Sequence, residues 1–136
     1  MTGKVNVIFK DYTIIGQDSI NAAHSAHCAG EQGKFWQYHD TLYDNWAGEN
    51  NGWASQENLV KFAQHVELDM NAFTQCNLQG TYAQIISTSN TDAQTLGITG
   101  TPAFYVILGN GGQVQQIQGA QPYEVFEKIF DSMLES

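Results

Sequence analysis

The stretch Gly100-Thr101-Pro102-Ala103-Phe104-Tyr105-Val106-Ile107-Leu108 joins a turn to a strand. Glycine and proline mark turns, and the run of β-branched and aromatic residues after them is typical of a buried strand. Pro102 therefore lies where a turn enters a sheet. A proline at such a point is a candidate for a cis peptide bond, because the X-Pro bond prefers trans only slightly. A trans proline at the start of an ordinary strand is the alternative that these residues leave open.

Patterned segments lie on both sides of this stretch. Lys4–Lys10 alternates apolar and polar residues, which predicts a strand. The glycine-rich segment 109–112 predicts a hairpin turn, and residues 113–118 then predict a returning strand. Pro122 is typical of the first turn of a helix, so we expect a closing helix after it.

Helical spacing dominates the chain from about residue 18 to about residue 96, with no strand pattern inside it. We expect Asp18 or Ser19 to cap the first of these helices. Ser55 and Asp69 would cap two later helices, and Gly97 would end the last one. The order of strand, helices, proline turn, two strands and helix is typical of an α/β class with a mixed sheet.

The composition indicates one globular domain and limits its partners. The 136 residues are 42% hydrophobic and 12% aromatic, which is enough for a single core. Fourteen acidic residues against five lysines and no arginine give a formal net charge of -9. A nucleic-acid or anionic-membrane partner would need a basic stripe, so we expect neither, and the charge favours solubility. The sequence shows no apolar span and no basic leader, so we also expect no membrane segment.

Four parts of the sequence carry a family resemblance. They are Asn21-Ala22-Ala23 with Cys28-Ala29-Gly30-Glu31-Gln32-Gly33-Lys34-Phe35-Trp36-Gln37-Tyr38-His39-Asp40, Phe73-Thr74-Gln75-Cys76, Gly97-Ile98-Thr99-Gly100-Thr101-Pro102-Ala103-Phe104, and Gly119-Ala120-Gln121-Pro122-Tyr123. In these parts the chain resembles the DsbA-like thiol-disulfide oxidoreductases of the thioredoxin superfamily. The Glu-Gln-Gly-Lys-Phe-Trp segment and the Gly-Thr-Pro turn are the most specific elements of the resemblance.

The resemblance implies a fold, a site and a class of substrate. It implies one thioredoxin-like domain over residues 1–136, with a helical insertion at about residues 18–96. It also implies a cis peptide bond between Thr101 and Pro102 that faces the active site. The substrates would be proteins or peptides with thiols or disulfides, the location would be outside the cytoplasm, and we expect no cofactor.

One part of the family pattern is missing from this sequence. The family has a further strand, and a helix that opens with Cys-x-x-Cys, upstream of the strand that begins this chain, and no Cys-x-x-Cys occurs here. A reactive thiol needs a pKa lowered by a helix N-terminus and a second thiol close by, whereas Cys28 falls near the end of its predicted helix. We therefore assign no catalytic residue and expect a truncated chain without dithiol redox activity. Whether the truncation is natural, or the start was placed too far downstream, stays open, and so does whether the chain is an enzyme.

The resemblance also implies a role for the two cysteines. By the family pattern Cys28 and Cys76 would form a structural disulfide, which could contribute about 4 kcal/mol in the chain-entropy description. Two buried free thiols are the alternative, and a pair that works in catalysis is a third. Sequence alone does not separate these three.

Two other groups of side chains could form sites. His24, His27 and Cys28 are adjacent on one predicted helix, and histidines three positions apart can share a metal ion. Structural zinc usually needs four placed ligands, and no further cysteine or histidine pair stands out, so we expect no metal site. Aromatic side chains could line a groove, although helical spacing is more typical of a core. These are Trp36, Tyr43, Trp46 and Trp53.

The pair Thr101 and Pro102 is the predicted binding site. In the family this turn presents backbone groups that pair with an extended substrate segment, a form of strand addition. The alternative is that the turn serves only folding. The missing first strand would lie between the Lys4–Lys10 strand and the Ala103–Leu108 strand, and open strand edges recruit other chains. We therefore expect a homo-oligomer, or a sheet whose strands pair anew, and our second hypothesis is a non-catalytic peptide-binding or assembly module.

Overall fold

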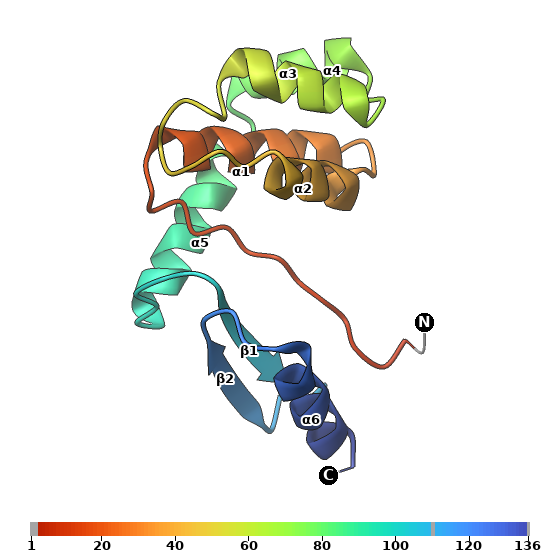
Figure 1. The fold of residues 1–136 in the computed structure, drawn as a ribbon, viewed down its shortest axis with the longest axis vertical. Coiled ribbons are helices and arrows are strands. Elements are labelled where there is room, and N and C mark those ends of the chain that lie inside the picture. Colours follow the sequence, from red (N-terminus) through yellow and green to blue (C-terminus); the bar gives the residue numbers. More distant parts are fainter. Residues whose placement is uncertain (1–2, 110, 136) are drawn as a thin grey trace. The chain divides into compact units, whose positions relative to one another are not determined.

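The computed structural model describes residues 3–109 and 111–135, which divide into two compact units. The helical unit is Lys10–Asp92, and the hairpin unit combines the residues up to Phe9 with those from Ala93 onward. Figure 1 shows the elements of both units along the chain. The helical unit is continuous in sequence, whereas the hairpin unit is assembled from the two ends of the chain.

The helical unit contains five helices, four of them complete. They are α1 (Gln17–Gly30), α2 (Phe35–Asp44), α3 (Gln56–His65), α4 (Met70–Gln79) and α5 (Ala83–Thr95), whose last residues belong to the hairpin unit. The Ser55 hydroxyl accepts a hydrogen bond from the backbone N–H of Asn58, and the Asp69 carboxylate accepts one from that of Ala72. Both predicted caps are thus confirmed, because each side chain satisfies a donor that the first helical turn leaves unpaired.

The predicted cap of the first helix is wrong. Helix α1 begins after Gly16, whose φ of 107° lies where a side chain would be strained, and an added Cβ there would meet the Asn50 side chain at 2.5 Å. The Asn50 amide oxygen instead accepts a hydrogen bond from the backbone N–H of Asp18. Asp18 itself is buried and accepts a hydrogen bond from the backbone N–H of Gly52 at 2.8 Å. A distant loop therefore satisfies this helix end, a contact that local sequence does not reveal.

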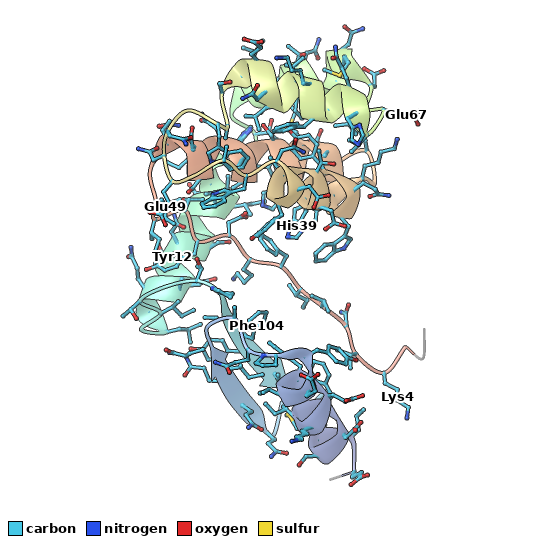
Figure 2. All side chains as sticks on the ribbon, viewed as in Figure 1. Lys4, Tyr12, His39, Glu49, Glu67 and Phe104 are labelled. Carbon is cyan, nitrogen blue, oxygen red and sulfur yellow. A yellow bond between two sulfur atoms is a disulfide. The ribbon has the colours of Figure 1, made fainter. Side chains whose placement is uncertain are left out.

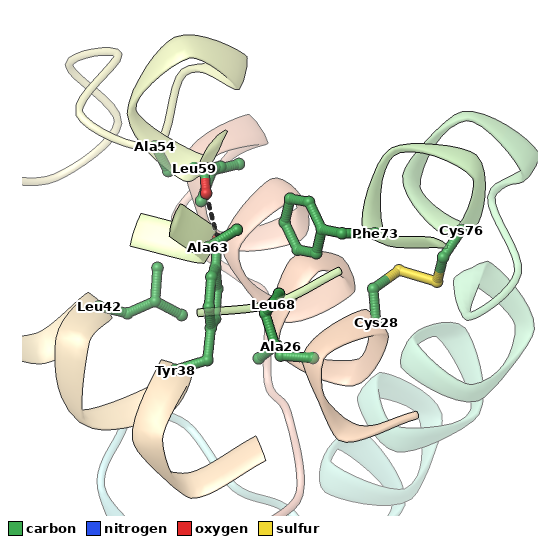
Figure 3. Close-up of a cluster of buried hydrophobic side chains, with 11 residues drawn as sticks. Ala26, Cys28, Tyr38, Leu42, Ala54, Leu59, Ala63, Leu68, Phe73 and Cys76 are labelled. Atoms are coloured by element: carbon green, nitrogen blue, oxygen red, sulfur yellow. Dashed lines mark hydrogen bonds between the residues drawn. A yellow bond between two sulfur atoms is a disulfide. The ribbon is translucent and has the colours of Figure 1, made fainter. Parts of the chain in front are cut away.

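The core of the helical unit forms where α1 to α4 meet. Figure 3 shows Tyr38, Leu59 and Phe73 packed together, and all three side chains are almost completely buried. The Tyr38 hydroxyl donates a hydrogen bond of 2.9 Å to the backbone carbonyl of Leu59. Burial raises the pKa of Tyr38 far above its ordinary value, since the ionised phenolate would lose its hydration. Tyr38 thus gives the core both apolar area and a paired polar group.

Helix α5 ends within the hairpin unit. Gly97, with a φ of 69°, ends the helix, and the N–H of Ile98 reaches back to the carbonyl of Ala93 at 3.0 Å, which confirms the predicted stop. Strands β1 (Ala103–Ile107) and β2 (Val114–Gln118) then form an antiparallel hairpin, as predicted. Asn110, in the middle of the predicted turn, lies outside the described residues. The last helix is α6 (Tyr123–Leu134), with Pro122 one position before it rather than inside it.

The strand predicted over Lys4–Lys10 is wrong. These residues carry the alternating pattern, yet within the described chain the sheet contains β1 and β2 alone. Val7 and Ile8 keep 67% and 79% of their surface exposed. Alternation is a necessary feature of a strand but not a sufficient one, because a strand also needs a neighbour to bond its N–H and C=O groups.

We expect the Tyr38→Phe variant to lower the free energy of unfolding by roughly 1–3 kcal/mol, because the buried Leu59 carbonyl loses its donor. Urea denaturation at neutral pH measures this change. The matched control is Tyr43→Phe on the same helix, where the side chain is 66% exposed and the loss should be small.

The same pair of variants tests the raised pKa of Tyr38. Above pH 10 the unfolded chain loses the Tyr38 proton before the folded protein does, so the unfolded state binds fewer protons and stability falls as the pH rises. The fall between about pH 10 and 11 should be shallower in Tyr38→Phe than in Tyr43→Phe. Parallel curves for the two variants would contradict this assignment.

Candidate functional site

The Thr101–Pro102 turn lies at the start of β1. Both residues are exposed, and the peptide bond between them is cis. The Pro102 carbonyl accepts a hydrogen bond of 2.9 Å from the backbone N–H of Gly119, which follows β2. This bond continues the register of the hairpin, in which Ala103 lies opposite Gln118. The turn is therefore held to β2 on one side.

The other side of β1 is an open strand edge. The Pro102 carbonyl and the Leu108 N–H both bond toward β2. Alternate residues of an antiparallel strand direct their backbone groups to the same side, so Phe104 and Val106 also face β2. The N–H and C=O groups of the residues between them point the opposite way, and no strand of the described chain lies there. These residues are Ala103, Tyr105 and Ile107, which with the turn we call the β1 edge.

Helix α6 supports β1 from one face. Phe104, labelled in Figure 2, contacts Phe126 of α6 edge to face, with the ring centroids 4.9 Å apart. Ile117, the partner of Phe104 across the hairpin, is buried. Aromatic pairs of this geometry stabilise packing beyond the area that they bury. The contacts fix the position of β1 within its unit while leaving the β1 edge accessible.

The two cysteines are placed far from this turn in sequence and lie in the helical unit. Cys28 on α1 and Cys76 on α4 form a disulfide, with their Cα atoms 5.8 Å apart. Figure 3 shows the bridge as part of the buried core cluster. Both residues are buried, so no thiolate is present at an accessible surface. The bridge acts as a staple between two helices.

The His24 side chain lies next to the disulfide and contacts residues of α4 and of the segment after α4. Its Nε2 accepts a hydrogen bond of 3.2 Å from the backbone N–H of Tyr82, so the neutral ring carries its proton on Nδ1. Nδ1 lies 3.4 Å from the Asn77 amide oxygen and 3.7 Å from the Cys28 sulfur. The Ser25 hydroxyl donates a hydrogen bond of 2.8 Å to the same amide oxygen. These contacts use the imidazole for packing α1 against the chain that follows α4.

The second histidine of the predicted metal pair has different partners. His27 Nε2 lies 2.7 Å from the buried Asp11 carboxylate, and the His27 ring stacks on Tyr82 at 5.0 Å. The Tyr82 hydroxyl donates to Glu31 at 2.9 Å, and partial burial together with this neighbouring carboxylate raises the pKa of Tyr82. Across the residues that the structure describes, no group of three or more histidine, cysteine or acidic side chains could hold a metal ion.

A shallow hollow of about 440 Å³ lies beside His24, between α1, α4 and α5. Several polar side chains of its lining are paired within the protein. Asn90 accepts from the Thr13 N–H and donates to the Thr13 hydroxyl, both at 2.8 Å, and Asn77 donates to the Phe73 carbonyl. The Asn77 and Asn90 amides of the hollow therefore hold helices and the entering chain together.

Sequence reasoning did not identify several of these residues. Asp11, Asn77 and Asn90 make contacts across 16, 52 and 77 positions of the chain. In its local sequence, each of these three residues is typical of a polar surface position. Only the packing of the helices brings its partner close. Only Asp11 had a signal in the sequence. It is an acidic residue at the point where the Lys4–Lys10 segment meets the connection to the first helix, and we did not identify it as a site residue.

Thiol titration of the denatured, unreduced protein should detect no free thiol, because both cysteines of the sequence are bridged. The Cys28→Ala/Cys76→Ala variant should lose roughly 4 kcal/mol of unfolding free energy, as the bridge closes a long loop of the unfolded chain. Urea denaturation under non-reducing conditions measures the loss. Two reactive thiols in the unreduced wild-type protein would contradict the bridge.

Comparison with known proteins gives consistent results. A model of the DSBA-like thioredoxin domain family matches residues 4–131. The "Probable disulfide bond formation protein D" of Bacillus cereus is 26% identical over 108 residues, which is 76% of this chain and 50% of that protein. The Rickettsia prowazekii protein named "Putative protein-disulfide oxidoreductase RP025" is 29% identical over 134 residues, which is 96% of this chain and 47% of that protein. The chain thus spans about half the length of these curated relatives.

A solved structure supports the fold. The crystal structure of a thioredoxin-like oxidoreductase from Silicibacter pomeroyi superimposes with a TM-score of 0.73 at 24% identity, covering 93% of this chain and 67% of that one. Within the described residues, no helix is both long enough and apolar enough to span a membrane. The α/β, thioredoxin-like fold class is therefore confirmed. The family match extends over nearly the whole sequence, and so the chain belongs to the DSBA-like thioredoxin domain family and is related to its thiol-disulfide oxidoreductases.

Proposed function

We propose that this chain, as it stands, binds extended polypeptide segments at the β1 edge and does not itself exchange disulfides. The single observation that carries the binding half is the open side of β1. Its outward N–H and C=O groups continue directly from the exposed Thr101–Pro102 turn. An extended segment that pairs there bonds groups that have no strand neighbour in the described chain, which is the physical basis of strand addition. The family relationship supports proteins or peptides with thiols or disulfides as the substrates.

The cysteine chemistry supports the second half of the proposal. Disulfide exchange needs an accessible thiolate and a resolving thiol next to it. This sequence contains no Cys-x-x-Cys, and its two cysteines are buried in a bridge between α1 and α4. A reductant would have to open the helical unit before either sulfur could react.

The insulin-reduction assay tests the lack of exchange activity. With dithiothreitol as the reductant, we expect the rate to equal that of the uncatalysed reaction, because no accessible thiolate is present. Thioredoxin at equal concentration is the positive control. Turnover comparable to thioredoxin would contradict this half of the proposal and would leave the binding half to be judged separately.

The Tyr105→Pro variant tests binding at the β1 edge. Proline at this position removes an outward N–H while leaving the bonds of Phe104 and Val106 to β2 in place, and proline is tolerated on strands at such edge positions. The matched control is Tyr105→Ala, which removes the same ring and keeps the N–H. The probe is reduced, carboxyamidomethylated lysozyme, an unfolded polypeptide without thiols, and binding is measured by calorimetry in a background with both cysteines replaced by serine.

We expect Tyr105→Pro to bind at least about tenfold more weakly than Tyr105→Ala, because an edge without this donor cannot complete the ladder. Equal affinity in the two variants would exclude the β1 edge. Amide signals in two-dimensional NMR add a second readout. Ala103 and Ile107 should shift on binding more than Phe104 and Val106, which already bond to β2.

A second occupant of the same edge is another copy of this chain. Val7 and Ile8 lie in an extended, exposed segment that has the alternation of a strand. Pairing of this segment with the β1 edge of a second copy would give a homo-oligomer. Sedimentation equilibrium of the protein without probe separates the two occupants, since self-association that Tyr105→Pro abolishes and Tyr105→Ala preserves would identify the second copy.

A further inference from the structure

Helix α2 carries a row of three rings along one side. The Trp36 and His39 centroids lie 5.3 Å apart, and the His39 and Tyr43 centroids lie 4.6 Å apart. Positions 36, 39 and 43 follow helical spacing, so the rings lie one above another. Trp36 also packs edge to face on Phe35, which in turn packs against the core. The base of the row is thus held in place by the core of the helical unit.

The outer parts of this row face solvent. Trp36 keeps 46% of its surface exposed and Tyr43 keeps 66%. Sequence analysis favoured a core role for both residues on the basis of their spacing, and the structure shows that this interpretation is wrong. The core side of α2 is formed by Tyr38 and Leu42 instead. Exposed aromatic faces in a row are typical of surfaces that contact a partner.

Carboxylates alternate with these rings. Asp40 lies four positions after Trp36, and Asp44 lies one position after Tyr43, both with exposed side chains. One Asp40 oxygen lies 2.9 Å from His39 Nδ1, which leaves its other oxygen as an acceptor. Desolvation by burial, and then the negative charge of Asp11, raise the pKa of the Tyr43 phenol. The surface therefore combines π faces with negative charge.

The lysines of the helical unit are engaged away from this row of rings. The residues of the helical unit include ten acidic side chains and three lysines. Lys10 pairs with Asp92, and Lys61 pairs with Glu57 at 2.7 Å. Lys34, just before α2, donates to the carbonyls of Val66 and Glu67 beyond α3. Each lysine is thus engaged at another surface of the unit.

We propose that this α2 surface, formed by Trp36, Tyr43, Asp40 and Asp44, binds cationic segments of unfolded polypeptides. A lysine or arginine side chain is attracted to an aromatic face and to a carboxylate, and here Asp40 lies four positions after Trp36 and three before Tyr43, on the same side of α2. The segment would place basic side chains between Trp36 and Asp40 and between Asp40 and Tyr43, and Asp44, four positions after Asp40, adds negative charge beside them. The net charge of the unit draws the same segments from solution. This surface is separate from the β1 edge and does not depend on disulfide exchange.

Two synthetic peptides of equal length test the proposal. One repeats Lys-Gly-Leu-Ser, and the other has glutamate at each lysine position. Tryptophan indole signals in two-dimensional NMR, assigned with single Trp→Phe variants, report binding to the wild-type protein. We expect the Trp36 signal to shift with the lysine peptide and not with the glutamate peptide. The dissociation constant should rise steeply with salt, because exposed charges are screened.

Charge-matched variants locate the site. Asp40→Asn/Asp44→Asn should raise the dissociation constant of the lysine peptide about fivefold or more, from the loss of two carboxylates at the contact. Glu124→Gln/Glu127→Gln on α6 removes the same charge from the other unit and should change it less than twofold. Trp36→Ala should raise it about two- to fivefold, the range of an exposed cation–π contact.

Three outcomes would overturn the proposal. They are binding of the glutamate peptide with equal affinity, equal weakening by the two charge-matched pairs, and an unshifted Trp36 signal at saturation. The first would show that the rings bind apolar segments regardless of charge. The second would show a general effect of net charge rather than a site. The acidic variants change exposed residues and should remain folded, so the test holds even if Trp36→Ala does not fold. Failure here would leave binding at the β1 edge untouched, since Tyr105→Pro reports on that edge alone.

Discussion

Strand β1 has a hydrogen-bonded neighbour on one side only in the described chain, and this constraint shapes both the hairpin unit and its proposed role. A strand satisfies its backbone polar groups in pairs with its neighbours, so an open side leaves donors and acceptors to water. The hairpin, the Gly119 bond to Pro102 and the Phe104–Phe126 contact hold β1 in a fixed register. A strand held in this way offers its free edge at a lower entropic cost than a mobile segment would.

The helical unit is stabilised by a buried core and a disulfide rather than by strand pairing. It buries a connected core around Tyr38 and Phe73 and adds a disulfide between α1 and α4. Two relatives of this chain have names that refer to disulfide chemistry. Here the sulfur atoms have a structural position, enclosed by helices and flanked by His24 and Asn77. The bridge thus joins two helices of the unit, and its burial limits the access of thiols to it, which supports the proposal that this chain does not exchange disulfides.

The two proposed surfaces recognise different features of a polypeptide. The β1 edge recognises backbone groups, which every extended polypeptide has, and so it provides little selection by side chain. The α2 surface recognises positive charge through rings and carboxylates, which selects among segments but contributes modest energy at an exposed site. Each surface belongs to a different compact unit. A weak selective contact and a general one could act together on the same extended polypeptide.

Local chemistry in the sequence determined the helices, two of their caps and the hairpin. Ser55, Asp69 and Gly97 act within one turn of their own position, which is why their roles could be predicted from neighbouring residues. The family resemblance, carried by short motifs, supplied the α/β class. Residues whose partners lie far along the chain could not be assigned in this way. Only the tertiary structure decided that Asn50 tethers the start of α1, that Lys4–Lys10 has no strand to pair with, and that Trp36 and Tyr43 face solvent. The physical reason is that capping depends on the next few residues, whereas burial and strand pairing depend on which distant surfaces the fold brings together.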